Sequence, residues 1–266
     1  MRKIIVIGIG AGDPEQVTLQ AVAAIRRTDV FFVLDKGEAK RELGDVRQEI
    51  LDRHAQGHDH RVVFGQDPER DRAAGGYTEA VDDWRRRRAD VCARRIGENL
   101  GEDQTGAFLV WGDPGLYDST LAILGDIAGR GLAFDLEVVP GISCVSALTA
   151  RHGIALNQVG APVQITTGRR LAKEWPPATD DVVVMLDARN AFTEHAERSD
   201  VEIYYGAYLG MPDEILISGP LPEVADRIVA ERAEARRRKG WIMDTYLLRR
   251  PLGAAPPDRP SSEPSD

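Results

Sequence analysis

The sequence predicts an α/β protein, and three observations indicate this fold class. Short runs rich in Val and Ile alternate with segments whose apolar residues recur at helical spacing, as in a sheet whose strands are connected by helices. Turns rich in Gly, Asp and Pro follow directly after several of the expected strands. The chain has 266 residues, a length that fits one large α/β domain or two small ones.

The first half of the chain predicts the beginning of a doubly wound sheet. Residues 3–7 form a buried parallel strand, residues 8–14 a glycine-rich turn, residues 17–27 a helix and residues 29–34 a second strand. Further along, we expect helices over 42–54, 79–100 and 119–129, strands over 61–64, 107–111 and 134–139, and a charged loop over 66–76.

A second unit is expected after the turn at Pro140-Gly141. Its expected helices are 143–152 and 224–239, and its expected strands are 163–167, 182–186, 202–209, 214–219 and 241–248. We therefore predict an N-terminal α/β domain over residues 1–139 and a C-terminal α/β domain over residues 140–251. Residues 252–266 are rich in Pro, Ser and Asp, and we expect them to be disordered.

The composition excludes some classes of function. The formal net charge is -9, which argues against a nucleic-acid-binding protein but leaves room for a local basic pocket. Cys92 and Cys144 are far apart, form no disulfide framework and suit a reducing cytoplasm. The apolar run after Met1 is too short for a signal peptide, and no apolar stretch reaches the ~20 residues of a membrane span. No spacing of His, Glu or Cys indicates a metal site.

The loop over residues 8–14 follows the first strand and reads Gly-Ile-Gly-Ala-Gly-Asp-Pro. A dinucleotide fingerprint would need a third glycine where Asp13 stands, and a carboxylate there would repel a pyrophosphate. A phosphate-binding role is therefore disfavoured. A tight turn from strand to helix remains as the purely structural explanation.

Two further segments also follow strands. The segment from Trp111 to Tyr117 contains a second Gly-Asp-Pro turn, and the segment from Val138 to Cys144 contains a Pro-Gly turn with Ser143 as a candidate helix N-cap. Ligands of open α/β sheets bind at the carboxyl ends of strands. Carboxylates and carbonyls at that edge suit a sulfonium with a ribose better than a phosphate, although a capped helix alone would explain the third segment.

In this order and spacing, the three segments resemble the tetrapyrrole methylases. The matching motifs are the glycine-rich loop with Val17-Thr18-Leu19 downstream, Gly-Asp-Pro-x-x-Tyr at residues 112–117 and Val-x-Pro-Gly-x-Ser at residues 138–143. The resemblance extends over residues 3–250. It implies the two-domain fold of class III methyltransferases, with S-adenosyl-L-methionine in the cleft between the domains, and a homodimer.

The resemblance also implies a set of cofactor contacts. Carried over residue by residue, they are Ala11, Trp111, Gly112, Asp113, Leu116, Ser143, Cys144, Leu186, Leu209 and Gly210. The chain departs from its relatives at Ala11, where they often have Pro, and at Ser143-Cys144, where they often have Thr-Ala. Simple packing is an alternative explanation for Cys144.

Residues 33–37, 67–72 and 84–88 resemble a subgroup that methylates precorrin-5 at ring carbon 1 and releases an acetyl group as acetate. Release of acetate calls for an activated water and hence a general base. Our candidate is Asp35, at the end of the second expected strand, with Lys36 to lower its pKa or hold a substrate carboxylate. Capping of the following turn is the alternative role for Asp35.

A substrate with many carboxylates calls for guanidinium groups, because arginine binds carboxylates through two hydrogen bonds. The candidate substrate-binding residues are Arg70, Arg72, Tyr77, Trp84 and Arg85, with the two aromatic side chains placed to flank the macrocycle. The alternative for residues 85–88 is a solvated helix face.

Other functions remain open at this stage. Within the family, the alternatives are methylation at another ring carbon and methylation of RNA or of a protein. The acidic composition of the chain disfavours the RNA acceptor. Outside the family, they are a nucleotide-dependent oxidoreductase, which Asp13 disfavours, and a ligand-binding protein without catalysis.

Overall fold

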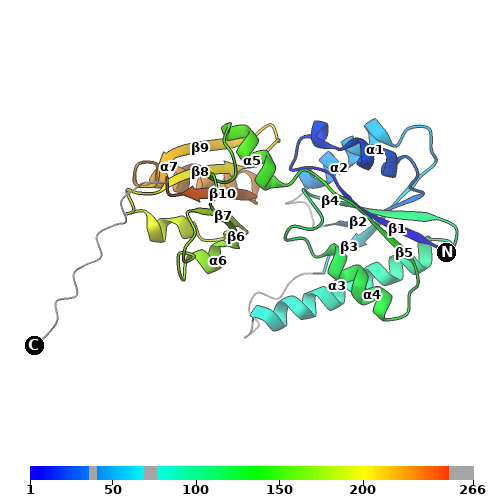
Figure 1. Cartoon of the computed structure of the whole chain (residues 1–266). Helices are drawn as coiled ribbons and strands as arrows, with labels where there is room; N and C mark the ends of the chain where they lie inside the picture. The colour runs from blue at the N-terminus through cyan, green and yellow to red at the C-terminus, as the bar shows by residue number, and fades with distance from the viewer. Residues whose placement is uncertain (36–40, 69–76, 252–266) are drawn as a thin grey trace, which may run out of the picture. The chain divides into compact units, whose positions relative to one another are not determined.

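The computed structural model describes residues 1–35, 41–68 and 77–251, and for residues 35, 41 and 77–81 it describes the backbone alone. This part of the chain forms two compact units, Met1–Ser143 and a second that begins at Cys144. Each contains a five-stranded sheet (Figure 1). The tail over 252–266, expected to be disordered, and residues 69–76 of the expected charged loop lie outside the described residues.

The first unit is a parallel sheet with the strand order β3-β2-β4-β1-β5. Its elements are β1 (Lys3–Gly8), η1 (Pro14–Gln16), α1 (Leu19–Ile25), β2 (Val30–Asp35), α2 (Arg41–His54), β3 (Arg61–Gln66), α3 (Tyr77–Asn99), β4 (Thr105–Val110), α4 (Thr120–Gly129) and β5 (Asp135–Val139). Parallel strands connected by helices are what the apolar runs predicted.

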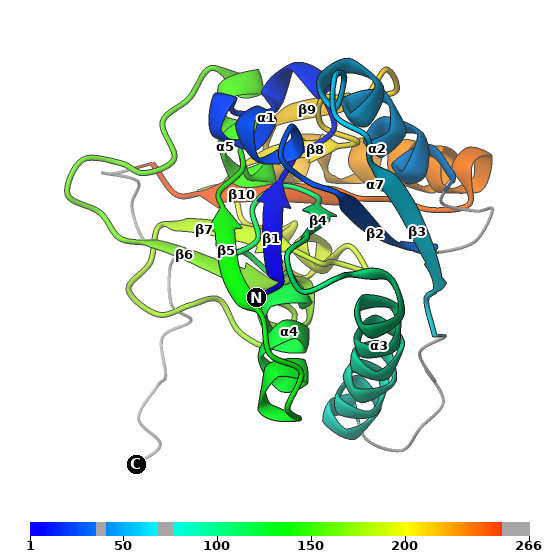
Figure 2. The same ribbon diagram turned by 90° about the vertical axis from the view of Figure 1, so that its right-hand side faces the viewer.

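Helices cover both faces of this first sheet, α1 and α2 on one face and α3 and α4 on the other (Figure 2). Alternate residues of β1 divide between the two cores. Ile4 and Val6 pack with residues of α3 and α4, whereas Ile5 and Ile7 pack with residues of α1 and α2. A strand buried on both faces must be apolar throughout, which explains the continuous Ile and Val run.

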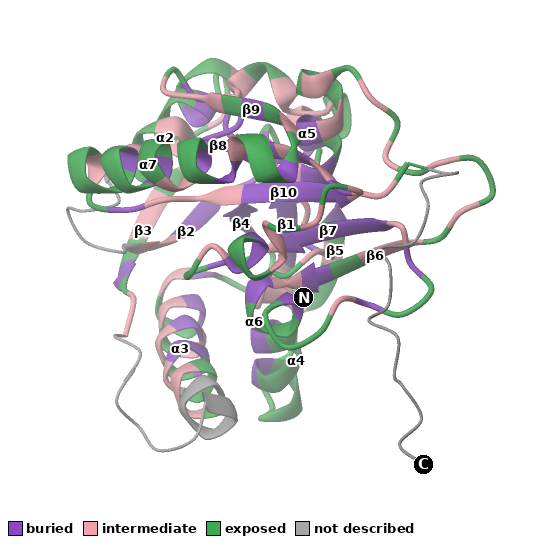
Figure 3. Cartoon of the chain, turned by 90° about the vertical axis from the view of Figure 1, so that its left-hand side faces the viewer, coloured by how far each residue is buried: buried purple, intermediate pink, exposed green. Residues whose placement is uncertain are grey.

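The second unit contains a mixed sheet with the order β6-β7-β10-β8-β9. Its elements are α5 (Cys144–His152), β6 (Val163–Thr167), α6 (Gly168–Leu171), β7 (Asp181–Met185), η3 (Ala191–His195), β8 (Glu202–Ala207), β9 (Ile215–Pro220), α7 (Leu221–Lys239) and β10 (Asp244–Arg249). β10 is antiparallel to both of its neighbours, β7 and β8. β7 and β10 are buried along most of their length (Figure 3).

Helices α5 and α7 cover opposite faces of this second sheet. A Cβ on Gly206 would lie 2.8 Å from Leu148 of α5. The neighbouring residue Tyr205 instead donates a hydrogen bond to Asp244, which also binds Arg232 of α7. Because consecutive residues of a strand point to opposite faces, the two helices lie on either side of β8.

The strands and long helices lie where the sequence predicted them, with ends displaced by a few residues. The first helix is shorter than the expected 17–27, because the Thr18 side chain accepts a hydrogen bond from the Ala21 amide and caps it. The last strand begins at Asp244 rather than at 241. The short helices α6 and η3 were not predicted. In the described part of the chain, no helix is long and apolar enough to span a membrane.

Candidate active site

Four glycines bring together the loops that follow β1, β4 and β5. The Gly112 amide donates a hydrogen bond to the Gly10 carbonyl at 2.7 Å. A Cβ on Gly141 would lie 2.2 Å from the Gly112 carbonyl oxygen, and a Cβ on Gly8 would lie 2.5 Å from the Gly141 nitrogen. No side chain fits in such a contact, so the loops meet backbone to backbone. The first three predicted segments therefore come together at the carboxyl ends of neighbouring strands.

Asp113 fixes this junction with both carboxylate oxygens. Its Oδ2 accepts a hydrogen bond from the Gly141 amide at 2.9 Å, which links the loop after β4 to the loop after β5. Its Oδ1 accepts from the Gly115 amide at 2.8 Å within its own loop. Leu116 closes the same turn through its amide, which donates to the Asp113 carbonyl. Asp113 thus shapes the loop that carries four of the ten predicted cofactor contacts, namely Trp111, Gly112, Asp113 itself and Leu116.

The glycine-rich loop after β1 uses its own side chains to satisfy its amides. Asp13 caps the short helix η1 and accepts a hydrogen bond from the Glu15 amide at 2.9 Å. Ala11 is buried, and its amide donates to Gln16 Oε1 at 3.0 Å. A carboxylate therefore occupies the helix start where a dinucleotide fold would hold a phosphate.

Trp111 lies beside a half-buried arginine, Arg47, which the sequence did not predict. The Arg47 guanidinium lies 6.0 Å from the centre of the Trp111 ring. Arg47 Nε also donates to the Leu109 carbonyl at 3.1 Å. β2 pairs with β4 at two positions, and the second pair is Phe31 with Ala107. The Leu109 carbonyl lies further along β4, beyond that pair. Burial lowers the pKa of Arg47, while the charge of Asp118 opposes that shift.

The predicted cofactor residues of the second unit gather at one edge of its sheet. Both β7 and β8 are antiparallel to β10, so their carboxyl ends lie at the same edge, beside the start of β10. Leu186 follows β7, and the pair Leu209-Gly210 follows β8. Thr245 of β10 lies opposite both strands and shares a hydrogen bond with Cys144.

Strained backbone marks several of these loops. Leu186, Tyr208 and Tyr117 have φ angles of 54°, 50° and 53°, in the left-handed region that such residues seldom adopt. Each lies in or beside a predicted cofactor segment. Residues held in such conformations cost about 1–3 kcal/mol each and cluster at functional sites. The sequence did not predict these conformations.

Leu209 and Gly210 differ in what they expose. The Leu209 side chain is buried, so only its backbone is available to a ligand. Gly210 has a φ of 77°, and its amide donates to Glu214 Oε2 at 2.7 Å. Tyr208, just before them, is held by the hydrogen bond from its hydroxyl to the Trp241 carbonyl at 2.6 Å.

Ser143 and Cys144 lie at the junction between the third loop and α5. Both side chains are partly buried. Burial raises the pKa of the Cys144 thiol to about 11, although hydrogen bonds, including one with Thr245, oppose that shift. Such a thiol stays protonated at neutral pH, so Cys144 suits a packing or hydrogen-bonding role and not that of a nucleophile.

The arginine run of α3 divides into exposed and buried members. Arg85 is exposed and its Nη1 lies 3.9 Å from Asp82. Arg85 and Arg86 also line an open hollow of about 490 Å³ between α3 and α4, where Asp82 and Asp126 balance their charge. Arg88, in contrast, is buried.

Arg88 and Trp84 form a cluster with the segment after β3. Arg88 Nε lies 2.8 Å from Asp67 Oδ1, and its guanidinium lies 4.5 Å from the centre of the Trp84 ring. Trp84 Nε1 donates to the Pro68 carbonyl at 2.9 Å. One face of Trp84 is therefore already covered by an arginine, which leaves its other face for the predicted contact with a macrocycle.

The remaining predicted residues are described in part or not at all. Asp35 is the last residue of β2, at the carboxyl edge of the first sheet, and Tyr77 begins α3, but only the backbone of each is described. Lys36, Arg70 and Arg72 lie outside the described residues. Their roles stay predictions. Among the described residues, no group of three or more His, Cys, Asp or Glu is placed to hold a metal ion.

Comparison with known proteins identifies related chains. The family model of Tetrapyrrole (Corrin/Porphyrin) Methylases matches residues 3–225. A protein of Sinorhizobium sp. named precorrin-6A synthase [deacetylating] is 49% identical over 251 residues, which cover 94% of this chain and 96% of that protein.

Solved structures agree with this likeness. A Corynebacterium diphtheriae protein described as related to cobalamin synthesis (CobF) superposes with a TM-score of 0.80 at 39% identity, over 94% of this chain and 99% of that one. The uroporphyrin-III C-methyl transferase of Thermus thermophilus, solved with S-adenosyl homocysteine, has a TM-score of 0.55 at 17% identity, over 92% and 96% of the two chains. At that identity the likeness concerns the fold alone.

Proposed function

The chain belongs to the tetrapyrrole (corrin/porphyrin) methylase family, and from this premise we propose that it is an S-adenosylmethionine-dependent C-methyltransferase that converts precorrin-5 to precorrin-6A with release of acetate. The observation that carries the proposal is the likeness, over nearly the whole of both chains, to a synthase whose name specifies deacetylation. The enzyme therefore serves cobalamin biosynthesis.

The described residues suit S-adenosylmethionine as methyl donor. The glycine junction lets the loop backbones approach a ligand closely, and the carbonyl and carboxylate oxygens there are compatible with a sulfonium and with ribose hydroxyls. The exposed apolar side chain of Leu186 offers contact area to an adenine ring. Asp13 keeps a phosphate away from the first loop. We assign the cofactor to the ten residues inferred above from the family motifs.

When bound, the cofactor supplies an electrophilic methyl group. The task of the protein is to align this group with ring carbon 1 of the substrate, and alignment alone lowers barriers by up to about 7–11 kcal/mol. Loops fixed by Asp113 and the glycines suit such a task because their backbone has little freedom to move.

Release of acetate needs a second set of groups. A water molecule adds to the acetyl carbonyl, the carbon–carbon bond to the macrocycle breaks, and a proton returns to the products. We assign the general base to Asp35, whose backbone ends β2 at the carboxyl edge of the sheet, with Lys36 beside it. The substrate carboxylates would bind Arg70, Arg72 and Arg85, with Tyr77 and Trp84 against the macrocycle.

We also propose that the enzyme is a homodimer and that it acts in the cytoplasm. The proposal of a homodimer is based on the family resemblance, and light scattering of the purified chain tests it. The cytoplasmic assignment is supported by the two cysteines, Cys92 and Cys144, which are unpaired as in proteins of a reducing compartment.

Mass spectrometry tests the reaction. The enzyme is incubated with precorrin-5 and S-adenosylmethionine that carries a deuterated methyl group. A tetrapyrrole that gains the labelled methyl and loses the two-carbon unit, with equal amounts of acetate and S-adenosylhomocysteine, is expected. Gain of the label without acetate would establish methylation at another ring carbon. No transfer by an enzyme that binds S-adenosylhomocysteine would refute the substrate assignment.

A further inference from the structure

Leu186 combines two features that do not serve folding. Its φ of 54° lies in the left-handed region, where the Cβ of a leucine crowds the backbone. Its side chain is 65% exposed, so the strain is not offset by burial of apolar surface. The preceding residue, Met185, is fixed by pairing with Thr167 on one side and Thr245 on the other. Something must therefore hold the chain on the other side of Leu186.

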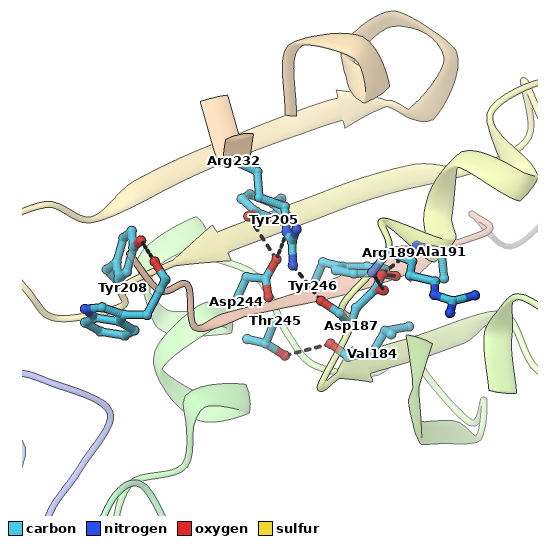
Figure 4. A network of polar contacts seen from close by, with 11 residues as sticks. Val184, Asp187, Arg189, Ala191, Tyr205, Tyr208, Arg232, Asp244, Thr245 and Tyr246 are labelled. Carbon is cyan, nitrogen blue, oxygen red and sulfur yellow. Dashed lines mark hydrogen bonds and ion pairs between the residues drawn. The ribbon is translucent and has the colours of Figure 1, made fainter. Parts of the chain in front are cut away.

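Asp187 holds the chain there (Figure 4). Its Oδ1 accepts a hydrogen bond from the Arg189 amide at 2.9 Å. Its Oδ2 accepts from the Ala191 amide at 2.6 Å and from the Tyr246 hydroxyl at 2.7 Å. The carboxylate is thus surrounded by three donors, and two of them bind it to the turn that follows Leu186.

Arg232 of α7 fixes the Asp187 main chain. Its Nη2 donates to the Asp187 carbonyl at 2.6 Å, and its Nε donates to Asp244 Oδ2, also at 2.6 Å. The Tyr205 hydroxyl donates to the same Asp244 oxygen at 3.1 Å. Arg232 is only 5% exposed, so its guanidinium has little freedom to leave this geometry.

The absence of a side chain at residue 168 leaves room for the Asp187 carboxylate, which with Arg232 and Tyr246 forms the anchor of this turn. A Cβ on Gly168, the first residue of α6, would lie 2.4 Å from Asp187 Cγ. Only glycine fits at that position while Asp187 keeps its place. Burial keeps the pKa of Tyr246 well above its usual value, so its hydroxyl remains a donor at neutral pH. The anchor therefore draws on α6, the turn after β7, α7 and β10.

We propose that Asp187, Tyr246 and Arg232 are positioning residues, which hold Leu186 in its left-handed conformation so that its main chain and exposed side chain are ready to contact S-adenosylmethionine. The inference rests on the proposed function, because it assigns a task to the cofactor contact at Leu186. None of the three needs to touch the cofactor. Their effect on binding passes through the backbone between Leu186 and Asp187.

The same strand provides a matched control. Asp181, at the other end of β7, is fully buried and also has both oxygens engaged, with Arg249 Nε at 2.6 Å and the Gln158 amide at 3.0 Å. In Asp187→Asn, whichever way the amide is oriented, its NH2 group faces a backbone N–H, that of Arg189 or that of Ala191. In Asp181→Asn, the NH2 group likewise faces a donor. Both variants lose buried hydrogen bonds, but only one lies beside Leu186.

The experiment measures binding of S-adenosylhomocysteine to the full chain by calorimetry, together with thermal unfolding. We expect Asp187→Asn to bind about tenfold more weakly than wild type, equivalent to about 1.4 kcal/mol, and Asp181→Asn to bind within about twofold of wild type. In the proposed methylation assay, Asp187→Asn raises KM for S-adenosylmethionine and leaves kcat at saturation nearly unchanged. Tyr246→Phe, which removes only a hydroxyl, shows the same pattern more weakly.

Two results would overturn the inference. One is wild-type affinity in Asp187→Asn, and the other is an equal loss of affinity in Asp181→Asn, which would make the effect one of general stability. If Asp187→Asn does not fold, Tyr246→Phe decides by the same criteria. A wild-type chain that does not bind S-adenosylhomocysteine would instead refute the proposed function, and the inference with it.

Discussion

The carbonyl oxygen of Gly112 occupies the space that a Cβ on Gly141 would need, at a separation of 2.2 Å. This contact joins the loop after β4 to the loop after β5. Because the atom in the way belongs to the backbone, it cannot rotate aside as a side chain would. The two loops can therefore approach each other this closely only because residue 141 has no Cβ.

Gly141→Ala is therefore expected to lower the free energy of unfolding by about 2 kcal/mol, a typical effect of overpacking, and to weaken binding of S-adenosylhomocysteine. Urea denaturation and calorimetry measure the two effects. Gly125→Ala in α4 is the control, since a Cβ there meets nothing within 4 Å. Alanine is expected to stabilise that helix by about 0.5–1 kcal/mol. Unchanged binding in Gly141→Ala would show that the junction does not shape the cofactor site.

Asp113→Asn tests the carboxylate that links the same loops. The asparagine keeps one acceptor oxygen, so its NH2 group must face either the Gly141 or the Gly115 amide. We expect a loss of about 1 kcal/mol in stability, because a donor at this half-buried junction is left unpaired, and weaker binding of S-adenosylhomocysteine.

Asp118→Asn is the matched control, because the Asp118 carboxylate makes a similar local bond, which it accepts from the Thr120 amide at 2.6 Å. Its effect on stability should be about 1 kcal/mol or less, and its effect on binding small. Equal effects of the two substitutions on binding would contradict a special role for Asp113.

Most of both sheets could be predicted from the sequence, because a strand buried on both faces must be apolar throughout, and β1 and β7 show this directly. The short helices could not. α6 begins at a glycine, and η3 follows Asn190 in a left-handed conformation. Neither has enough turns to show a helical period, and both depend on contacts with other parts of the chain.

The candidate site was predictable only in part, for a similar reason. The Gly-Asp-Pro and Pro-Gly turns follow strands and stand out locally. Arg47 does not, because nothing in α2 shows that its side chain reaches the Leu109 carbonyl, 62 residues away. Likewise, Asp187 meets Arg232 and Tyr246 across 45 and 59 residues of sequence. Such pairs become visible only when the fold brings them together.

Leu186→Asn tests whether the strain at Leu186 serves binding. Asparagine tolerates the left-handed conformation better than leucine does, so the variant is expected to gain about 0.5–1 kcal/mol in the free energy of unfolding. It should bind S-adenosylhomocysteine more weakly, because the exposed apolar side chain is gone. Thermal unfolding and calorimetry measure the two changes.

The control for this prediction is Leu216→Asn in β9, where a leucine of 37% exposure has an ordinary strand conformation. Asparagine is unfavourable in strands, so this variant should be less stable than wild type and bind normally. A loss of stability in Leu186→Asn would show that the leucine contributes more to folding than its strain costs.

The ion pair between Arg198 and Asp200 predicts part of the acid sensitivity of the protein. Arg198 donates two hydrogen bonds to Asp200, at 3.1 and 2.7 Å, and these lower the pKa of the Asp200 carboxyl. A carboxyl with a lowered pKa in the folded state contributes stability above its unfolded pKa of about 3.9, and this contribution is lost as the pH falls through the folded value.

Urea denaturation at a series of pH values from about 7 down to about 3 measures this contribution. At about pH 7, Asp200→Asn should be less stable than wild type by about 1 kcal/mol. The difference should shrink toward pH 3, because protonation removes the same charge from the wild type. A difference that stays constant over this range would mean that the Asp200 side chain contributes through packing and not through its charge.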